Sequence, residues 1–336
     1  MPVTDLVKAQ VDVEATWGVC GTADHLLMGI TDATLNIMDS VHQVERSGWY
    51  YPSDLVAQVQ QHGEGSLSID LSYEEILYML DNFFDAETPA TSTTTTGTVT
   101  YTYYNWAYDA PTDTTVTPSP LTIEFGAPNA QYQACGLLFT ELNISGEAGG
   151  VWTGTFPFLA QEVNTVTMAT VTDSAVELIR MADTEIYMDT WAGTIGTTKK
   201  DDALISFDLS VTSGRHLKQF GGELEPQDWG DTQWTGTLTT VLEFTAAVKS
   251  HVDDLLDPTA TPIQRMIRIQ ADNDATAVSG NDRIATIDFY GTLVDGVELF
   301  GDRDGNVTIS LTWQGTWNDT DSAWLGFDIK NVVTGL

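Results

Sequence analysis

The sequence is poor in positive charge and in cysteine. Its 336 residues include 13 Lys and Arg against 48 Asp and Glu, a net charge of −35. Because such a chain repels phosphates, it is not expected to bind nucleic acid or an anionic membrane by itself. The two cysteines, Cys20 and Cys135, are too few for a disulfide framework or a structural zinc site.

Long hydrophobic runs are also missing, which excludes a transmembrane helix. Residues 1–12 lack the charged start and apolar stretch of a signal peptide. A 42% hydrophobic and 10% aromatic composition nevertheless excludes a disordered acidic tail. We therefore expect a soluble, folded protein made in the cytosol. Its scattered carboxylates fit either adaptation to high salt or a surface that must repel a polyanion, and composition does not separate the two.

Catalytic and cofactor motifs are absent from the sequence. There is no phosphate-binding glycine loop, no dinucleotide fingerprint, no Gly-x-Ser-x-Gly elbow and no His-Glu-x-x-His. The five histidines follow no metal-ligand spacing; they are His25, His42, His62, His216 and His251. We therefore expect no enzyme activity, no cofactor and no metal. A hydrolase using two of the 48 carboxylates stays open as a minor hypothesis.

Period-two alternation predicts a mainly β protein. Polar and apolar residues alternate in Ser66–Leu71, Leu204–Val211 and Asn306–Trp313, and Thr, which favours strands, is abundant. A Trp-x-Gly-Thr tetrapeptide recurs four times, beginning at Trp152, Trp191, Trp234 and Trp313. Since residues i and i+2 of a strand share a face, we expect each Trp ring to cover its own glycine. The alternative is that these rings, with Trp49 or Trp106, form a platform on which sugars stack.

Two segments have helical patterns. Tyr73–Phe84 follows Ser72, which forms a capping box with Glu75, and carries an apolar stripe. Ala246–Leu256 is the second. Each follows a Gly-Ser/Thr-Leu strand, in Gly65–Asp85 and Gly236–Asp257, at an offset of 171 or 172 residues. The sequence therefore indicates two divergent copies of one β domain with a flanking helix, residues 1–165 and 166–336.

An insertion at residues 86–120 distinguishes the first copy. Its Thr- and Pro-rich ends indicate loops, and its centre, with Tyr101, Tyr103, Tyr104, Trp106 and Tyr108, alternates like a hairpin. These aromatic side chains suit a protein interface or a cover for the sheet of their own domain, and both interpretations are open.

This arrangement resembles the major tail tube proteins of long-tailed, siphovirus-like bacterial and archaeal viruses, in a double-domain form. The resemblance rests on Gly65–Asp85, Gly236–Asp257, Leu137–Phe156 and Ile284–Trp317. It implies two tandem β-sandwich or barrel domains, each with one flanking helix. It also implies a structural virion protein of the tail, assembled in the host cytoplasm, that forms a trimeric, pseudo-hexameric ring. Stacked rings would enclose a tape-measure protein, contact tail end proteins, and later conduct viral DNA without specific binding and without a membrane partner.

The resemblance also suggests roles for particular residues. Acids on polar strand faces would line the channel and repel DNA; the candidates are Asp70, Glu141, Asp208 and Asp288. The segment Val41–Gly65 would be an extended loop that contacts the next ring, or a loop folded onto its own domain. Its candidate contact residues are Trp49, Tyr50, Tyr51 and Pro52. The alternative function is a β-sandwich module that binds carbohydrate or protein in an acidic, salt-loving organism.

Overall fold

Antiparallel strands make up most of the regular structure in the computed structural model, as the alternation predicts. The structure describes residues 8–45, 48, 55–96, 99–127, 130–200, 203–245, 248–249, 262–273, 283–303 and 305–336. No helix among these residues has the length and apolar character needed to cross a membrane.

One long antiparallel sheet contains strands from both halves of the sequence. In order across the sheet, they are β3 (Ile30–Gln43), β4 (Val56–Asp70), β10 (Trp152–Ala160), β9 (Glu141–Glu147), β13 (Leu204–Thr212), β16 (Thr235–Glu243), β19 (Asn306–Gly315) and the later part of β18 (Ile284–Arg303). Strands β9 and β13 join the two halves directly.

Two further sheets pack with this long sheet around a core of buried apolar residues. The second sheet runs β12 (Thr184–Thr190), β17 (Gln264–Asp272), the early part of β18, β20 (Leu325–Asn331), β6 (Val99–Asp109) and β5 (Ala90–Thr96). The third runs β2 (His25–Leu26), β1 (Lys8–Val13), β7 (Leu121–Ala127), β8 (Ala130–Phe139) and β11 (Glu162–Thr165). The short elements are β14 (His216–Lys218), β15 (Asp228–Gly230) and η2 (Met181–Asp183).

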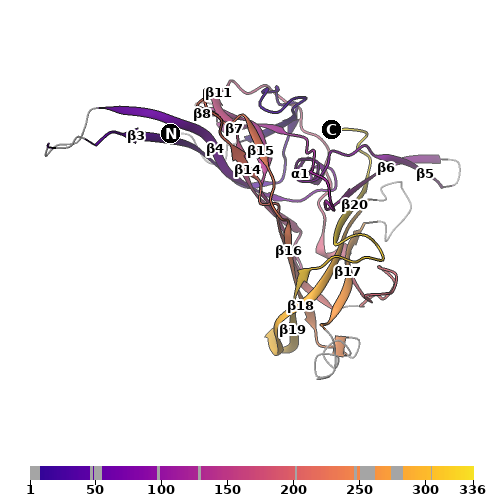
Figure 1. Ribbon diagram of the computed structural model, residues 1–336. Helices are drawn as coiled ribbons and strands as arrows, with labels where there is room; N and C mark the ends of the chain where they lie inside the picture. Colours follow the sequence, from indigo (N-terminus) through magenta and orange to yellow (C-terminus); the bar gives the residue numbers. More distant parts are fainter. Residues whose placement is uncertain are drawn as a thin grey trace.

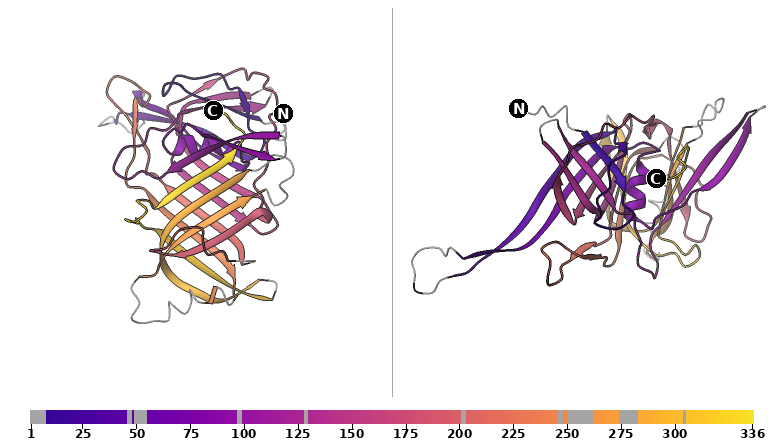
Figure 2. Two further views of the ribbon diagram at one scale, coloured as in Figure 1. Left: turned by 90° about the vertical axis from the view of Figure 1, so that its right-hand side faces the viewer. Right: turned by 90° about the horizontal axis from the view of Figure 1, so that it is seen from above.

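The strands of the insertion belong to the second sheet, whose other strands come from much later in the chain. Strand β6 pairs with β20, and the hairpin of β5 and β6 projects from the body on the side opposite to that of β3 and β4 (Figures 1 and 2). Tyr103, Trp106 and Tyr108 are buried. These aromatic residues therefore cover a sheet, as one of the two interpretations holds, but the sheet consists mainly of strands from the C-terminal half.

The first predicted helix is present as α1 (Ile76–Phe83), which begins three residues later than predicted. The expected contact at its start is present, because the Glu75 amide donates to Ser72 Oγ at 3.1 Å. Almost all side chains of the helix are themselves buried, so the helix is a core element and not a flanking one. Of the second predicted helix, the structure describes only Val248 and Lys249, both helical.

The Trp-x-Gly-Thr prediction is wrong in its contacts. Phe156, and not Trp152, is the ring closest to the open side of Gly154. Trp324 lies over both Gly236 and Gly315. Rings that cover a glycine come here from two residues later in the chain or from another segment, so the spacing within the tetrapeptide does not determine the contact. The segment that begins at Trp191 is a turn.

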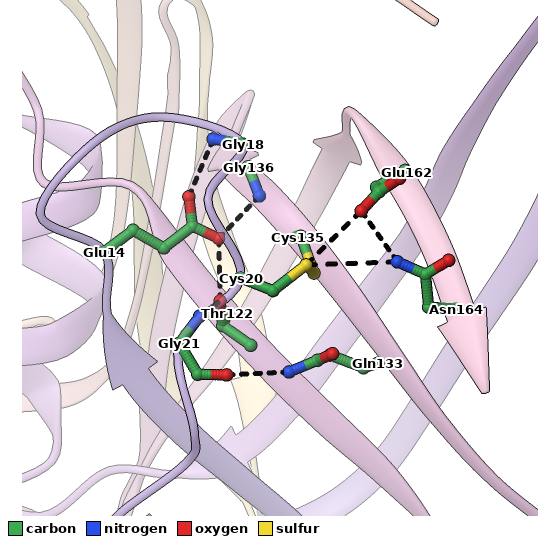
Figure 3. The surroundings of a disulfide bond; sticks show 10 residues. All are labelled: Glu14, Gly18, Cys20, Gly21, Thr122, Gln133, Cys135, Gly136, Glu162 and Asn164. Atoms are coloured by element: carbon green, nitrogen blue, oxygen red, sulfur yellow. Dashed lines mark hydrogen bonds between the residues drawn. A yellow bond between two sulfur atoms is a disulfide. The ribbon is translucent and has the colours of Figure 1, made fainter. Parts of the chain in front are cut away.

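A disulfide joins Cys20, in the segment between β1 and β2, to Cys135 in β8 (Figure 3). Beside it, the Glu14 carboxylate accepts hydrogen bonds from the Gly18 and Gly136 amides and from Thr122 Oγ1 (Figure 3). The sequence has too few cysteines for a framework, but this one pair fixes the N-terminal segment to the third sheet.

Candidate functional site: a polar sheet face and an exposed arm

The long sheet has one buried apolar face and one polar face. On β13, for example, Phe207, Leu209 and Val211 are buried, whereas Asp208 is exposed. The same alternation holds on β4, β9, β10, β16 and β19. Because strand side chains alternate between faces, these six strands expose one continuous surface that crosses both halves of the chain.

Hydroxyl side chains cross this polar face from strand to strand. Three pairs lie within hydrogen-bond distance: Ser68 and Thr155 at 3.2 Å, Ser145 and Thr153 at 3.0 Å, and Thr239 and Thr312 at 3.3 Å. Such pairs hold side chains in place without adding charge. Between the acids, this surface therefore carries uncharged hydroxyl groups that pair across strands.

The charged groups on this face are all acidic. On the polar-face positions of β4 from Glu64 onward, and of β9, β10, β13, β16 and β19, there is no Lys or Arg. The acids are Glu64, Asp70, Glu141, Glu147, Asp208 and Glu243. Three predicted residues, Asp70, Glu141 and Asp208, are thus brought together on one surface. Asp70 and Asp208 lie in one cross-strand row, through Thr153 and Ser145.

The fourth predicted acid, Asp288, lies elsewhere. It belongs to the early part of β18 in the second sheet and forms two hydrogen bonds of 2.6 Å with Arg268 on β17. This contact raises the pKa of Arg268. Burial and the nearby Asp288 raise the pKa of Asp109 on β6. Alternation identified the polar side of β18 correctly, but no local signal shows that this long strand passes from one sheet to the other.

The contact between β9 and β13 is a seam between the two halves. Seven residue pairs are in register, from Glu147 with Ser206 to Glu141 with Thr212. Among these pairs, Asn143 faces Ser210. At the two ends of the long sheet, β3 and the later part of β18 each pair on one side only within the described residues. No local pattern predicts this seam, because the two strands that pair lie far apart in the chain.

An arm, defined as residues 37–44 and 55–63 at the outer end of the β3–β4 hairpin, projects from the body (Figures 1 and 2). The predicted extended loop is therefore mostly a regular hairpin, and it is not folded onto its own domain. Its exposed apolar side chains are Ile37, Met38, Val41, Val44, Leu55, Val56 and Val59. The predicted contact residues Trp49, Tyr50, Tyr51 and Pro52 lie outside the described residues.

The arm exposes more apolar side chains than is usual for a two-stranded hairpin in an isolated chain. A two-stranded hairpin is at best marginally stable in water, and seven exposed apolar side chains on one such hairpin indicate a binding partner. Val41 and Val56 are 53% and 57% exposed. Burial of this surface would remove the unfavourable contact of both strands with water.

The described residues contain one group of potential metal ligands, Cys20, Cys135 and Glu162. Both cysteine sulfurs are bonded to each other, so neither is a free thiolate that could bind a metal. No protein-family model matches the chain, and no curated protein is similar to it in sequence.

Proposed function

We propose that this protein is a structural subunit of a viral tail tube, which assembles into rings and stacks of rings around a channel for DNA. The observation that carries the proposal is the polar face of the long sheet, where the six strands β4 (from Glu64), β9, β10, β13, β16 and β19 bear acids and hydroxyls without Lys or Arg. Such a face repels phosphates and offers no cation to hold them, which suits a channel through which DNA slides.

The strand order supports a repeated unit. Four strands in the order β3-β4-β10-β9 are followed across the seam by four in the order β13-β16-β19-β18. In each group of four, the second strand carries the matched glycine, Gly65 or Gly236. We therefore propose that each group belongs to one of two tandem domains of the tail-tube type.

The seam provides a template for contacts between copies. Asn143 lies in the row Ser68–Thr155–Asn143, and the matched row of the second group is Thr239–Thr312–Val294. Ser210, which faces Asn143, is matched in the same way by Thr34 on β3. Repetition of the seam would therefore place Val294 of one copy opposite Thr34 of the next.

This contact is heterologous, so it either closes into a ring or continues as a filament. Closure by three copies gives a pseudo-sixfold ring and removes both exposed sheet edges. The arm, whose apolar side chains need a partner, would then contact the neighbouring ring. A tape-measure protein and tail end proteins would be the further partners of the assembled tube.

Negative-stain electron microscopy of the purified chain, over a range of protein and salt concentrations, tests this proposal. Hollow rings or tubes with threefold or pseudo-sixfold views are expected. Uniform monomers under every condition would contradict it.

Cysteine cross-linking tests the seam between copies. Thr34→Cys together with Val294→Cys should give covalent dimers and trimers on mild oxidation, because directly opposed residues of neighbouring strands lie within disulfide range. The matched control combines Thr34→Cys with Ser310→Cys, which places the second thiol one strand away from the edge. Equal cross-linking of both variants would rule out the proposed register.

A further inference from the structure

A cleft lined by three tryptophans lies where the segment after β6, the segment before β16 and the segment between β19 and β20 meet. It consists of two adjoining hollows of about 570 and 240 Å³. Gln233, Trp234, Trp317 and Trp324 line both hollows. We propose that this cleft binds a neutral oligosaccharide.

Two of the three indole rings are held by packing, and the third is exposed beside them. Trp324 lies over Gly236 and Gly315, and the Trp234 ring packs against Phe83 with centroids 4.9 Å apart. Trp317 is 41% exposed and lines both hollows. Aromatic rings that are fixed on one side and open on the other can pack against the C–H face of a sugar ring, which buries apolar surface at little entropic cost.

Polar groups surround these rings. Gln233 and Gln314 are exposed, and no hydrogen bond of either side-chain amide occurs within the described part of the chain. Thr112 and Thr114 line the opposite wall of the larger hollow. Amides and hydroxyls both donate and accept hydrogen bonds, as sugar hydroxyls do. A mainly apolar floor with a few convergent polar groups is typical of small-molecule sites.

The charges favour a neutral ligand over an ion. No Lys, Arg or His lines either hollow, so an anionic sugar would find only the carboxylates of Asp113 and Asp231. Asp231 forms a salt bridge of 2.9 Å with Arg215, and Asp113 accepts a hydrogen bond from Thr112. A bound cation would therefore meet one carboxylate that is already paired with Arg215 and one that already accepts a hydrogen bond. The larger hollow is also wider than a single ammonium group enclosed by aromatic rings requires. Sugar binding at this cleft does not require ring assembly.

Isothermal titration of the full chain with cellotetraose, maltotetraose, xylotetraose and mannotetraose, each up to about 10 mM, tests the proposal. At least one is expected to bind saturably and to change the tryptophan fluorescence. Trp317→Ala should weaken that binding at least about tenfold, whereas Trp317→Tyr, which keeps an aromatic ring, should stay within about threefold.

Two further variants keep the test decisive. Trp191→Phe changes a tryptophan that does not line the cleft and should leave affinity unchanged. Gln233→Ala with Gln314→Ala alters exposed side chains only, so this variant should fold normally and bind the sugar more weakly. It tests the cleft even where Trp317→Ala does not fold. Absence of binding by all four sugars, unchanged affinity in both cleft variants, or displacement of the sugar by choline chloride would each overturn the proposal.

Discussion

At the scale of single residues, Arg215 joins the two halves of the chain. Its guanidinium is fully buried and donates to Asp231 at 2.9 Å. It also donates to the carbonyls of Asn82 and Phe83, at the end of α1, and to that of Phe139. Burial lowers the pKa of Arg215, and the contact with Asp231 opposes this effect. One cation thus satisfies carbonyl groups that the helix end leaves without partners.

We expect Arg215→Met to lower the free energy of unfolding by about 3–5 kcal/mol, because it leaves Asp231 and three buried carbonyls without their donor. Urea unfolding followed by circular dichroism measures this loss. The control is Arg180→Gln, which breaks an exposed ion pair with Asp183 and should leave the unfolding midpoint nearly unchanged. Equal effects of the two variants would contradict a structural role for Arg215.

Glu14 leads to a prediction about pH. Burial raises its pKa from the ordinary value of 4.5, and hydrogen bonds from Gly136, Thr122 and Gly18 oppose the rise. Since the folded pKa exceeds the unfolded one, the folded state binds the proton more tightly, and the contribution of Glu14 to stability falls as pH rises through this range.

Glu14→Gln removes this titration. The variant also loses one hydrogen-bond acceptor, which changes its free energy of unfolding by an amount that does not depend on pH. The wild type should therefore become less stable relative to the variant as pH rises from about 4 to 7. Urea unfolding at several pH values measures the difference. A difference that stays constant, or that changes in favour of the wild type, would contradict the raised pKa.

At the scale of elements, local patterns predicted strands and the helix better than their partners. The Ser72–Glu75 contact and the buried stripe of α1 follow from spacing within one segment, and so do the alternating faces of β4 and β13. The pairing of β6 with β20, the seam, and the position of Asp288 do not. Alternation specifies which side of a strand is apolar, whereas its neighbour depends on the packing of the whole chain.

The arm is the element whose role is easiest to separate from folding. We expect deletion of residues 41–58, with β3 and β4 rejoined by a Gly-Asn turn, to leave rings intact and to prevent their stacking, because the body buries its core without the arm. Electron microscopy and sedimentation velocity distinguish rings from tubes. Val41→Ser with Val56→Ser should weaken stacking in the same direction, since both side chains are exposed in the single chain. Tubes of normal length in the deletion variant would exclude the arm from ring contacts.

At the scale of the whole molecule, net charge and its placement have separate consequences. Every copy carries a charge of −35, which keeps the whole surface repulsive to nucleic acid. The polar face of the long sheet adds a local property, since on β4 (from Glu64), β9, β10, β13, β16 and β19 its acids and hydroxyls form one surface without Lys or Arg. If the acid content served only solubility in salt, the position of each acid would not affect DNA, and exchanges at different positions would be equivalent.

Charge reversal separates these two possibilities. Asp70→Lys with Asp208→Lys places two cations in one row of the polar face, so a ring of three copies would present six around the channel. We expect these rings to retain duplex DNA, with an affinity that falls steeply as salt rises, whereas wild-type rings do not. The control is Asp173→Lys with Glu223→Lys, which makes the same change in net charge at exposed positions outside the long sheet. Co-sedimentation with linear DNA at two salt concentrations measures retention. Equal retention by both variants would mean that net charge alone acts, and would remove the reason for assigning the polar face to a channel.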